Sequence, residues 1–176
     1  MEMQDERLIN ADRSAVWAAL LDPEVLKNCV PGASEVTGTP EDGFEATVTQ
    51  KVGPVKATFK GQVSLLDMTE PERLTLSGEG KGGAAGFAKG TAHVTLEEAE
   101  GGGTRLIYEV DAKVGGKLAQ LGSRIVDGFA KKMADQFFGN LEAMFADPEE
   151  EGAGEEGAPE AAEKKGWLKR MMRKDA

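Results

Sequence analysis

The sequence predicts an α+β domain in which a curved antiparallel sheet of seven strands wraps around one long C-terminal helix. Two patterns predict this fold. Apolar and polar residues alternate with a period of two through residues 33–114, and apolar residues keep a helical period through residues 115–145. A third observation is that one short strand and two short helices precede the alternating region. A sheet with one apolar face and a helix with one apolar stripe each bury what the other exposes.

The chain begins with a short strand followed by two short helices. The strand is predicted over Met3–Ile9, and the first helix over Arg13–Leu21, where apolar residues share one face. Asp22 followed by a proline starts the second helix, because proline is favoured at the first helical position. Pro31 and the glycine after it end this helix, and the period then changes to two.

Six further strands are predicted, each bounded by glycine or proline turn signals. They span Glu35–Gly38, Phe44–Val52, Val55–Met68, Arg73–Gly80, Ala88–Glu97 and Thr104–Val114. In the third of these, apolar residues such as Phe59 alternate with polar residues such as Lys60, so one face is apolar and the other is solvated. Short turns between consecutive strands predict an antiparallel meander.

One continuous helix of about 45 Å is predicted from Gly115 to Phe145. Its apolar stripe consists of Leu118, Leu121, Ile125, Phe129, Met133, Phe137, Leu141 and Met144. Gly122 and Gly128 lie along or beside this stripe, although a glycine costs a helix interior about 1 kcal/mol relative to alanine. Either another backbone packs closely there, or the small residues leave room for a ligand.

Composition excludes several classes of function. The chain has one cysteine, Cys29, and one histidine, His93, which argues against a disulfide framework, a zinc site and most catalytic triads, so no metal site is expected. Residues 1–146 contain 15 Lys/Arg and 22 Asp/Glu, a net charge of −7, so no nucleic-acid partner is expected. No apolar run reaches the length of a membrane span and no signal peptide is recognisable, which predicts a cytoplasmic protein.

No motif forms a convincing catalytic constellation. Residues 78–83 match G-x-G-x-x-G literally, but strand alternation follows them instead of the helix that a dinucleotide site needs, so they are read as a turn. His93 is expected to be an ordinary strand residue, and Cys29 a small buried one. The aromatic and methionine residues are either core or the lining of an apolar cavity, in which the hydroxyl of Tyr108 would orient a ligand.

The C-terminal residues divide into a linker and a basic segment. Residues 147–165 are acidic and lack large apolar groups, which predicts a disordered linker. The last eleven residues, 166–176, have the pattern of an amphipathic helix on an anionic membrane surface. The predicted membrane-anchoring residues are Trp167, Leu168, Lys169, Arg170, Met171, Met172, Arg173 and Lys174. Docking on a partner protein and a solvated basic tail are the alternatives.

Four strings of residues resemble one protein family over most of residues 1–146. They are VWAALLDPEVLKNCVPG at 16–32, KVGPVKATFKG at 51–61, GGAAGFAKGTAHVTL at 82–96 and GGKLAQLGSRIVDGFAKKMADQFF at 115–138. They resemble the CoxG family of carbon monoxide dehydrogenase components. The order of elements also resembles the helix-grip arrangement of the START-like, or SRPBCC, superfamily, whose members enclose an apolar cavity between sheet and last helix. The resemblance implies that residues 82–90, around Phe87, lie at the mouth of that cavity.

The resemblance implies a non-catalytic carrier at the inner face of the cell membrane. Members of the family are linked to molybdenum-containing carbon monoxide dehydrogenases and related oxidoreductases, and to moving a quinone between the bilayer and the enzyme. Menaquinone or ubiquinone is therefore the expected ligand, with no covalently bound cofactor. The expected lining, chosen by face, is Phe59, Phe87, Tyr108, Leu121, Ile125, Phe129 and Met133. The alternatives are an adaptor that binds no ligand and recruits the oxidoreductase, and an enzyme on the same fold.

Overall fold

The computed structural model describes residues 1–146. The predicted linker at 147–165 and the membrane-anchoring segment at 166–176 lie outside the described residues. Residues Met1–Leu141 form one compact unit.

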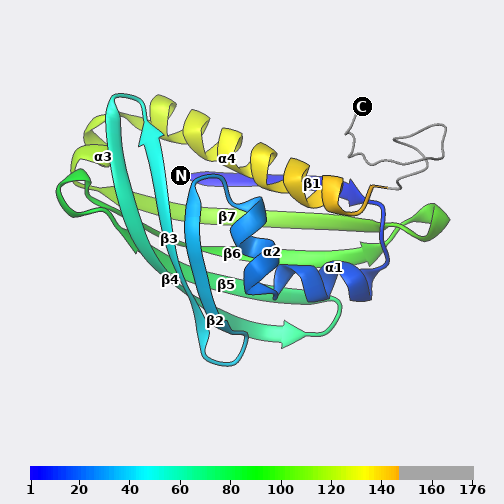
Figure 1. The fold of residues 1–176 in the computed structure, drawn as a ribbon. Coiled ribbons are helices and arrows are strands. Elements are labelled where there is room, and N and C mark those ends of the chain that lie inside the picture. The colour runs from blue at the N-terminus through cyan, green and yellow to red at the C-terminus, as the bar shows by residue number, and fades with distance from the viewer. Residues whose placement is uncertain (147–176) are drawn as a thin grey trace, which may run out of the picture. The chain divides into compact units, whose positions relative to one another are not determined.

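The elements follow the predicted order of strand, two helices, six strands and C-terminal helix (Figure 1). The strands are β1 (Glu2–Ile9), β2 (Ala33–Thr39), β3 (Gly43–Val52), β4 (Val55–Thr69), β5 (Arg73–Lys81), β6 (Phe87–Glu98) and β7 (Thr104–Gly115). The helices are α1 (Arg13–Leu20), α2 (Pro23–Cys29), α3 (Lys117–Gln120) and α4 (Ser123–Met144), with short 3₁₀ turns η1 (Gly83–Ala85) and η2 (Glu100–Gly102).

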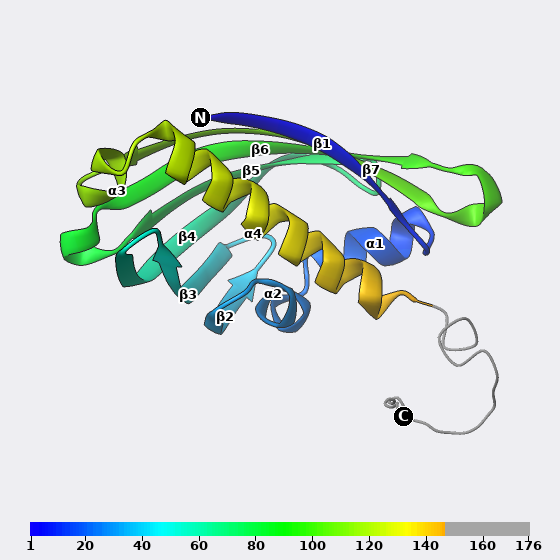
Figure 2. The same cartoon turned by 90° about the horizontal axis from the view of Figure 1, so that it is seen from above.

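The seven strands form one antiparallel sheet with the order β1-β7-β6-β5-β4-β3-β2. Strands β2 to β7 are therefore a meander, and β1 closes the β7 edge by pairing Glu2 with Asp111 and Ile9 with Thr104. The sheet curves, and α4 runs across its strands on the concave side (Figure 2). This arrangement confirms the predicted curved sheet around a C-terminal helix.

The two short helices begin at aspartate caps, and the second begins at the predicted Asp22. The side chain of Asp12 accepts a hydrogen bond from the Ala15 amide, and that of Asp22 accepts one from the Glu24 amide, each at 2.9 Å. Each bond satisfies one of the backbone donors that a helix start leaves unpaired. Helix α1 buries Val16 and Trp17, and α2 buries Cys29.

The prediction of one continuous helix from Gly115 to Phe145 is wrong at its N-terminal end. Strand β7 continues to Gly115, α3 is a separate turn, and α4 is a 22-residue helix of about 33 Å. Gly116 and Gly122 flank α3 with φ values of 72° and 90°. These backbone conformations cost other residues free energy, so the two glycines divide the apolar stripe into two helices.

The close packing considered for Gly122 and Gly128 does not occur. A Cβ atom on Gly122 or on Gly128 would meet no heavy atom within 4 Å outside its own helix. Both glycines are exposed, and neither lines a cavity. Their positions therefore do not support the hypothesis that Gly122 and Gly128 leave room for a ligand.

Candidate functional site

The concave face of the sheet changes from large to small side chains along its length. Near the β6–β7 turn, the inward residues are large, and Leu74, Leu96 and Leu106 are fully or almost fully buried, with Leu74 and Leu106 at the wall of a cavity. Near α3, the inward positions of β5 and β6 are occupied by Gly80 and Ala88, which pair with each other. The small side chains at the α3 end leave volume unfilled beneath α4.

Two adjoining cavities occupy the space between the sheet and α4. The larger has a volume of about 480 Å³ and the smaller about 300 Å³. They adjoin because the same five residues line both, namely Met3, Val30, Val110, Ala134 and Phe137. Both volumes fall within the range of sites that bind small apolar ligands. Their lining is almost wholly apolar, with Gln50 and Tyr108 as the polar side chains.

Residues from α4 and β4 form the walls of the larger cavity. Val126, Phe129, Met133 and Phe137 lie three or four residues apart on α4, so they project from one face of the helix. Phe59 of β4 lies across from them on the sheet. Its ring packs over Gly82, where a Cβ atom would lie 2.5 Å from the Phe59 Cε1 atom. The absence of a side chain at Gly82 therefore determines the position of the Phe59 ring, which forms one wall of the cavity.

Tyr108 lines the smaller cavity and is held by contacts from β1 and α4. Its ring stacks on Phe138 with a centroid separation of 4.8 Å, and only 4% of the residue is exposed. Burial raises the pKa of the Tyr108 hydroxyl, and a hydrogen bond from Arg7 opposes that rise. The phenol oxygen accepts from Arg7, so the phenol proton is the part of this group that can donate to a ligand carbonyl.

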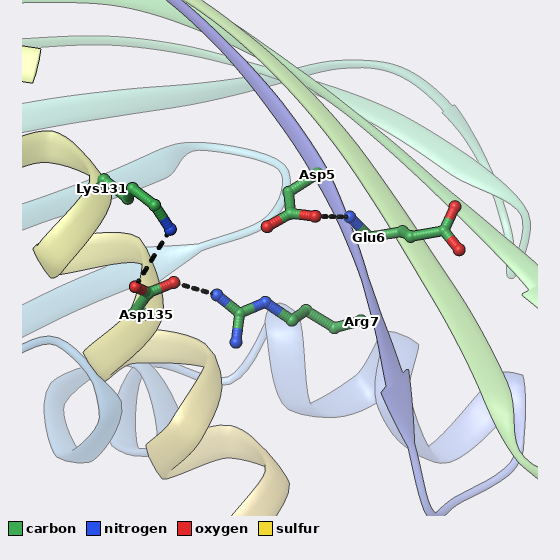
Figure 3. A network of polar contacts seen from close by, with 5 residues as sticks. All are labelled: Asp5, Glu6, Arg7, Lys131 and Asp135. Carbon is green, nitrogen blue, oxygen red and sulfur yellow. Dashed lines mark hydrogen bonds and ion pairs between the residues drawn. The ribbon is translucent and has the colours of Figure 1, made fainter.

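Arg7 also ties the sheet edge to α4 (Figure 3). Its guanidinium on β1 donates to the Asp135 carboxylate on α4, and Lys131 contacts the same carboxylate at 3.5 Å. Desolvation raises the pKa of Asp135, but the Arg7 hydrogen bond and the Lys131 charge outweigh it, so the pKa lies below its usual value. Asp135 is therefore ionised at neutral pH and fixes α4 over β1.

Gln50 is the polar group of the larger cavity. Its Nε2 atom donates to the Pro31 carbonyl oxygen at 2.6 Å, which anchors the side chain. The amide can offer its remaining hydrogen-bonding atoms to a ligand. Each cavity therefore has one polar side chain in an apolar lining.

The structure brings four of the seven predicted lining residues to the cavities. Phe59, Phe129 and Met133 line the larger one, and Tyr108 lines the smaller one. Phe87, Leu121 and Ile125 line neither cavity.

Each of the three remaining residues has a physical reason for its position. Phe87 pairs with Lys81 on β5, one residue out of phase with the inward Ala88, so it lies on the convex face. Leu121 lies in the break between α3 and α4. Ile125 lies at the edge of the inward stripe, and a Cβ atom on Gly53 would contact both it and Leu121.

Sequence reasoning missed most of the lining. Gln50, Val126 and Phe137 lie at inward positions of β3 and α4 and were not among the expected residues. The small inward residues Gly80, Ala88 and Ala112 were the available signal, because a run of them on one face of adjacent strands predicts unfilled volume.

The other motifs occupy the structural positions predicted for them. Residues 78–83 end β5 and lead into the η1 turn, which confirms a turn between strands. His93 lies on β6, and its Nδ1 atom is 2.9 Å from the Thr75 hydroxyl oxygen. Cys29 is 1% exposed, and burial raises the pKa of its thiol.

Residues 1–146 offer neither a cluster of metal ligands nor a helix that could span a membrane. No group of three or more potential metal ligands is found in this part of the chain. None of its helices is both long and apolar enough to cross a bilayer.

Comparisons with known proteins agree with this architecture. The model of the family described as the carbon monoxide dehydrogenase G-subunit (CoxG) matches residues 6–146. A conserved protein from Geobacillus kaustophilus is 26% identical with a TM-score of 0.77, covering 82% of this chain and 95% of that chain. A START superfamily protein from Mycobacterium smegmatis is 13% identical with a TM-score of 0.62, covering 82% and 96%. No curated protein sequence matches the chain. The START-like fold predicted from the sequence is confirmed.

Proposed function

This chain belongs to the CoxG family of carbon monoxide dehydrogenase components, and we propose that it is a non-catalytic carrier of an apolar ligand. The observation that supports this role is the pair of adjoining apolar cavities between the sheet and α4. An unfilled apolar space costs packing energy, and a ligand of matching chemistry recovers it. The family name points to carbon monoxide dehydrogenase as the partner, and we propose a molybdenum-containing form of that enzyme or a related oxidoreductase.

A quinone, menaquinone or ubiquinone, suits the chemistry of the two cavities. Its isoprenoid chain needs an extended apolar surface, which the α4 face and the concave sheet provide. Its carbonyl oxygens need hydrogen-bond donors, which Tyr108 and Gln50 provide. A carrier of such a ligand works between the bilayer and a soluble enzyme, with the protein peripheral on the inner face of the cell membrane.

Binding of added quinone to two matched variants tests the carrier role. Ala134 lines both cavities, so Ala134→Phe places a ring into the shared space. Gln136 is exposed on α4, so Gln136→Phe adds a ring of the same size outside the cavities. We expect Ala134→Phe to lower the affinity for a short-chain quinone at least tenfold and Gln136→Phe to leave it unchanged. Equal affinity in both variants and the wild type would favour the adaptor that binds no ligand.

A further inference from the structure

The charged residues near the two ends of the sheet differ in sign. Because the strands are antiparallel, the β3–β4 turn, the β5–β6 turn and the end of β7 lie at the same end as α3 (Figure 1). The lysines in or next to these elements, which we call the basic rim, are Lys51, Lys56, Lys81, Lys89, Lys113 and Lys117. The turns at the opposite end are acidic, with Glu41, Asp42, Glu70, Glu72, Glu98 and Glu100.

The lysines of the basic rim are exposed and unpaired within the described chain. None of the six forms an ion pair with any residue between 1 and 146, and all six side chains are exposed. The ion pairs of this part of the chain involve Arg7, Arg13, Arg105 and Lys131, which all lie outside the rim. Glu79 lies opposite Lys89 in the β5–β6 register, and the charge of the other five lysines is available to an external partner.

Apolar side chains are exposed beside these lysines. Phe87 follows η1 and is 37% exposed, and Ile125 in the first turn of α4 is 41% exposed. Pro54 and Ala84 are also exposed, at the tips of the two turns. Basic residues next to exposed apolar groups are the combination that binds the interface of an anionic bilayer.

The larger cavity extends to the same end of the sheet. Val52 at the end of β3, Val114 near the end of β7 and Leu118 of α3 all line it. α3 lies between Gly116 and Gly122, whose positive φ values make these the points where the chain changes direction. A surface that contacts the basic rim therefore lies next to the cavity wall formed by α3.

We propose that the basic rim docks onto an anionic lipid bilayer and holds the α3 end of the cavity against the membrane. Residues 1–146 carry a net charge of −7, so a nucleic acid or an anionic bilayer would repel the domain in most orientations. The separation of charge between the two ends of the sheet selects the orientation with the rim toward the lipid. Phe87 and Ile125 then enter the interfacial region. The inference extends the proposed carrier function, but the docking itself does not depend on an occupied cavity.

Partition of the full chain onto vesicles tests the docking surface. The rim variant is K51Q/K56Q/K117Q, and the matched control is K27Q/R73Q/K132Q, which removes three exposed basic residues outside the rim. The C-terminal segment is the same in both. Each charge near an anionic surface contributes about fivefold to partition, so on phosphatidylglycerol vesicles the rim variant should bind about a hundredfold more weakly than wild type. The control should lose fivefold at most. Equal losses in the two variants would overturn the proposal.

A second measurement reports the orientation directly. A polarity-sensitive dye attached at Ala84→Cys in the rim should shift to shorter wavelength when vesicles are added, and the same dye at Ser14→Cys on α1 should not. Native Cys29 is buried and does not compete for the label. Equal shifts at both positions, or binding of the rim to an acidic protein with no loss of vesicle binding in the rim variant, would overturn the assignment to lipid. Solvent extraction of the same variants reports ligand content separately, so loss of docking with ligand retained leaves the carrier function intact.

Discussion

Gly82→Ala tests whether the Phe59 ring forms a movable wall of the larger cavity. A Cβ atom on Gly82 would lie 2.5 Å from Cε1 and 2.7 Å from Cδ1 of that ring. The φ of Gly82 is −117°, which alanine adopts without strain, so the substitution acts through this contact alone. Ordinary contact begins near 3.4 Å, and the ring must therefore move by about 1 Å. The cavity is the open direction for that movement.

The loss of free energy of unfolding that Gly82→Ala causes depends on the space into which the Phe59 ring moves. Overpacking a filled core costs about 1–3 kcal/mol, and we expect a value near the lower end because the ring moves into unfilled volume. For a domain of this size, about 1 kcal/mol lowers the Tm by roughly 2–5 °C. The dissociation constant of the apolar ligand should rise by a larger factor than the equilibrium constant of unfolding. The reason is that the displaced ring occupies space that the ligand uses.

A double-mutant cycle isolates the contact between these two residues. Phe59→Leu removes the ring, so Gly82→Ala in that background should lower the free energy of unfolding by less than half of its effect in the wild type. The assay is urea unfolding followed by circular dichroism, with ligand titration on the same four proteins. Gly80→Ala serves as the control for the unfolding measurement alone, because a Cβ atom there lies 3.9 Å from the Phe59 Cβ atom, an ordinary contact, whereas Gly80 itself lines the cavity. An undiminished cost of Gly82→Ala in the Phe59→Leu background would show that the ring is not what the new methyl group displaces.

Four further predictions follow from individual residues. Gly139→Ala should raise the free energy of unfolding by about 0.5–1 kcal/mol in urea titrations, because its Cβ atom would enter open space on a helix; a loss of stability would contradict this. Gly122→Ala should lower it by about 1–2 kcal/mol, since alanine is strained at a φ of 90°; an unchanged midpoint would mean that α3 and α4 rejoin as one helix. Asp135→Asn should be less stable than wild type at neutral pH. Because the folded pKa of Asp135 is lowered, its stabilisation is present above the unfolded pKa near 4 and disappears as pH falls through the folded value, so thermal unfolding of the two proteins should converge in acid. Tyr108→Phe should weaken quinone binding by about 2- to 10-fold while retaining the ring stack on Phe138, and equal affinity would remove the hydroxyl from ligand recognition.

The strand order and the sheet face were predictable from alternation. Register follows from the period of two, so the inward set of β4 that contains Phe59 could be identified without coordinates. The same rule places Phe87 on the convex face, because it precedes the inward Ala88 by one residue. The expectation that Phe87 lines the cavity disagrees with this phase, and its place at the cavity mouth was implied by the family resemblance alone.

The break between α3 and α4 was not predictable from hydrophobic period alone. Helical spacing continues across Gly122, from Leu118 and Leu121 to Ile125. The same spacing is found whether these residues belong to one helix or to two. Gly122 is a signal for close packing, for ligand space or for a change of chain direction, and the period does not separate these. The unfilled volume beneath α4 also depends on how the elements face one another. Residues that line the cavity could therefore be distinguished from residues that fill the core only when the positions of β5, β6 and α4 were known.

The carrier function requires that the space between the sheet and α4 holds an apolar ligand. Native mass spectrometry of the full chain, purified without detergent from cells that make quinones, measures this most directly. We predict a mass increase of one bound molecule per chain, lost after solvent extraction and identified in the extract as menaquinone or ubiquinone, and absent from Ala134→Phe. A wild-type protein that shows only the mass of the polypeptide, with an extract free of quinone and lipid, would contradict the carrier function.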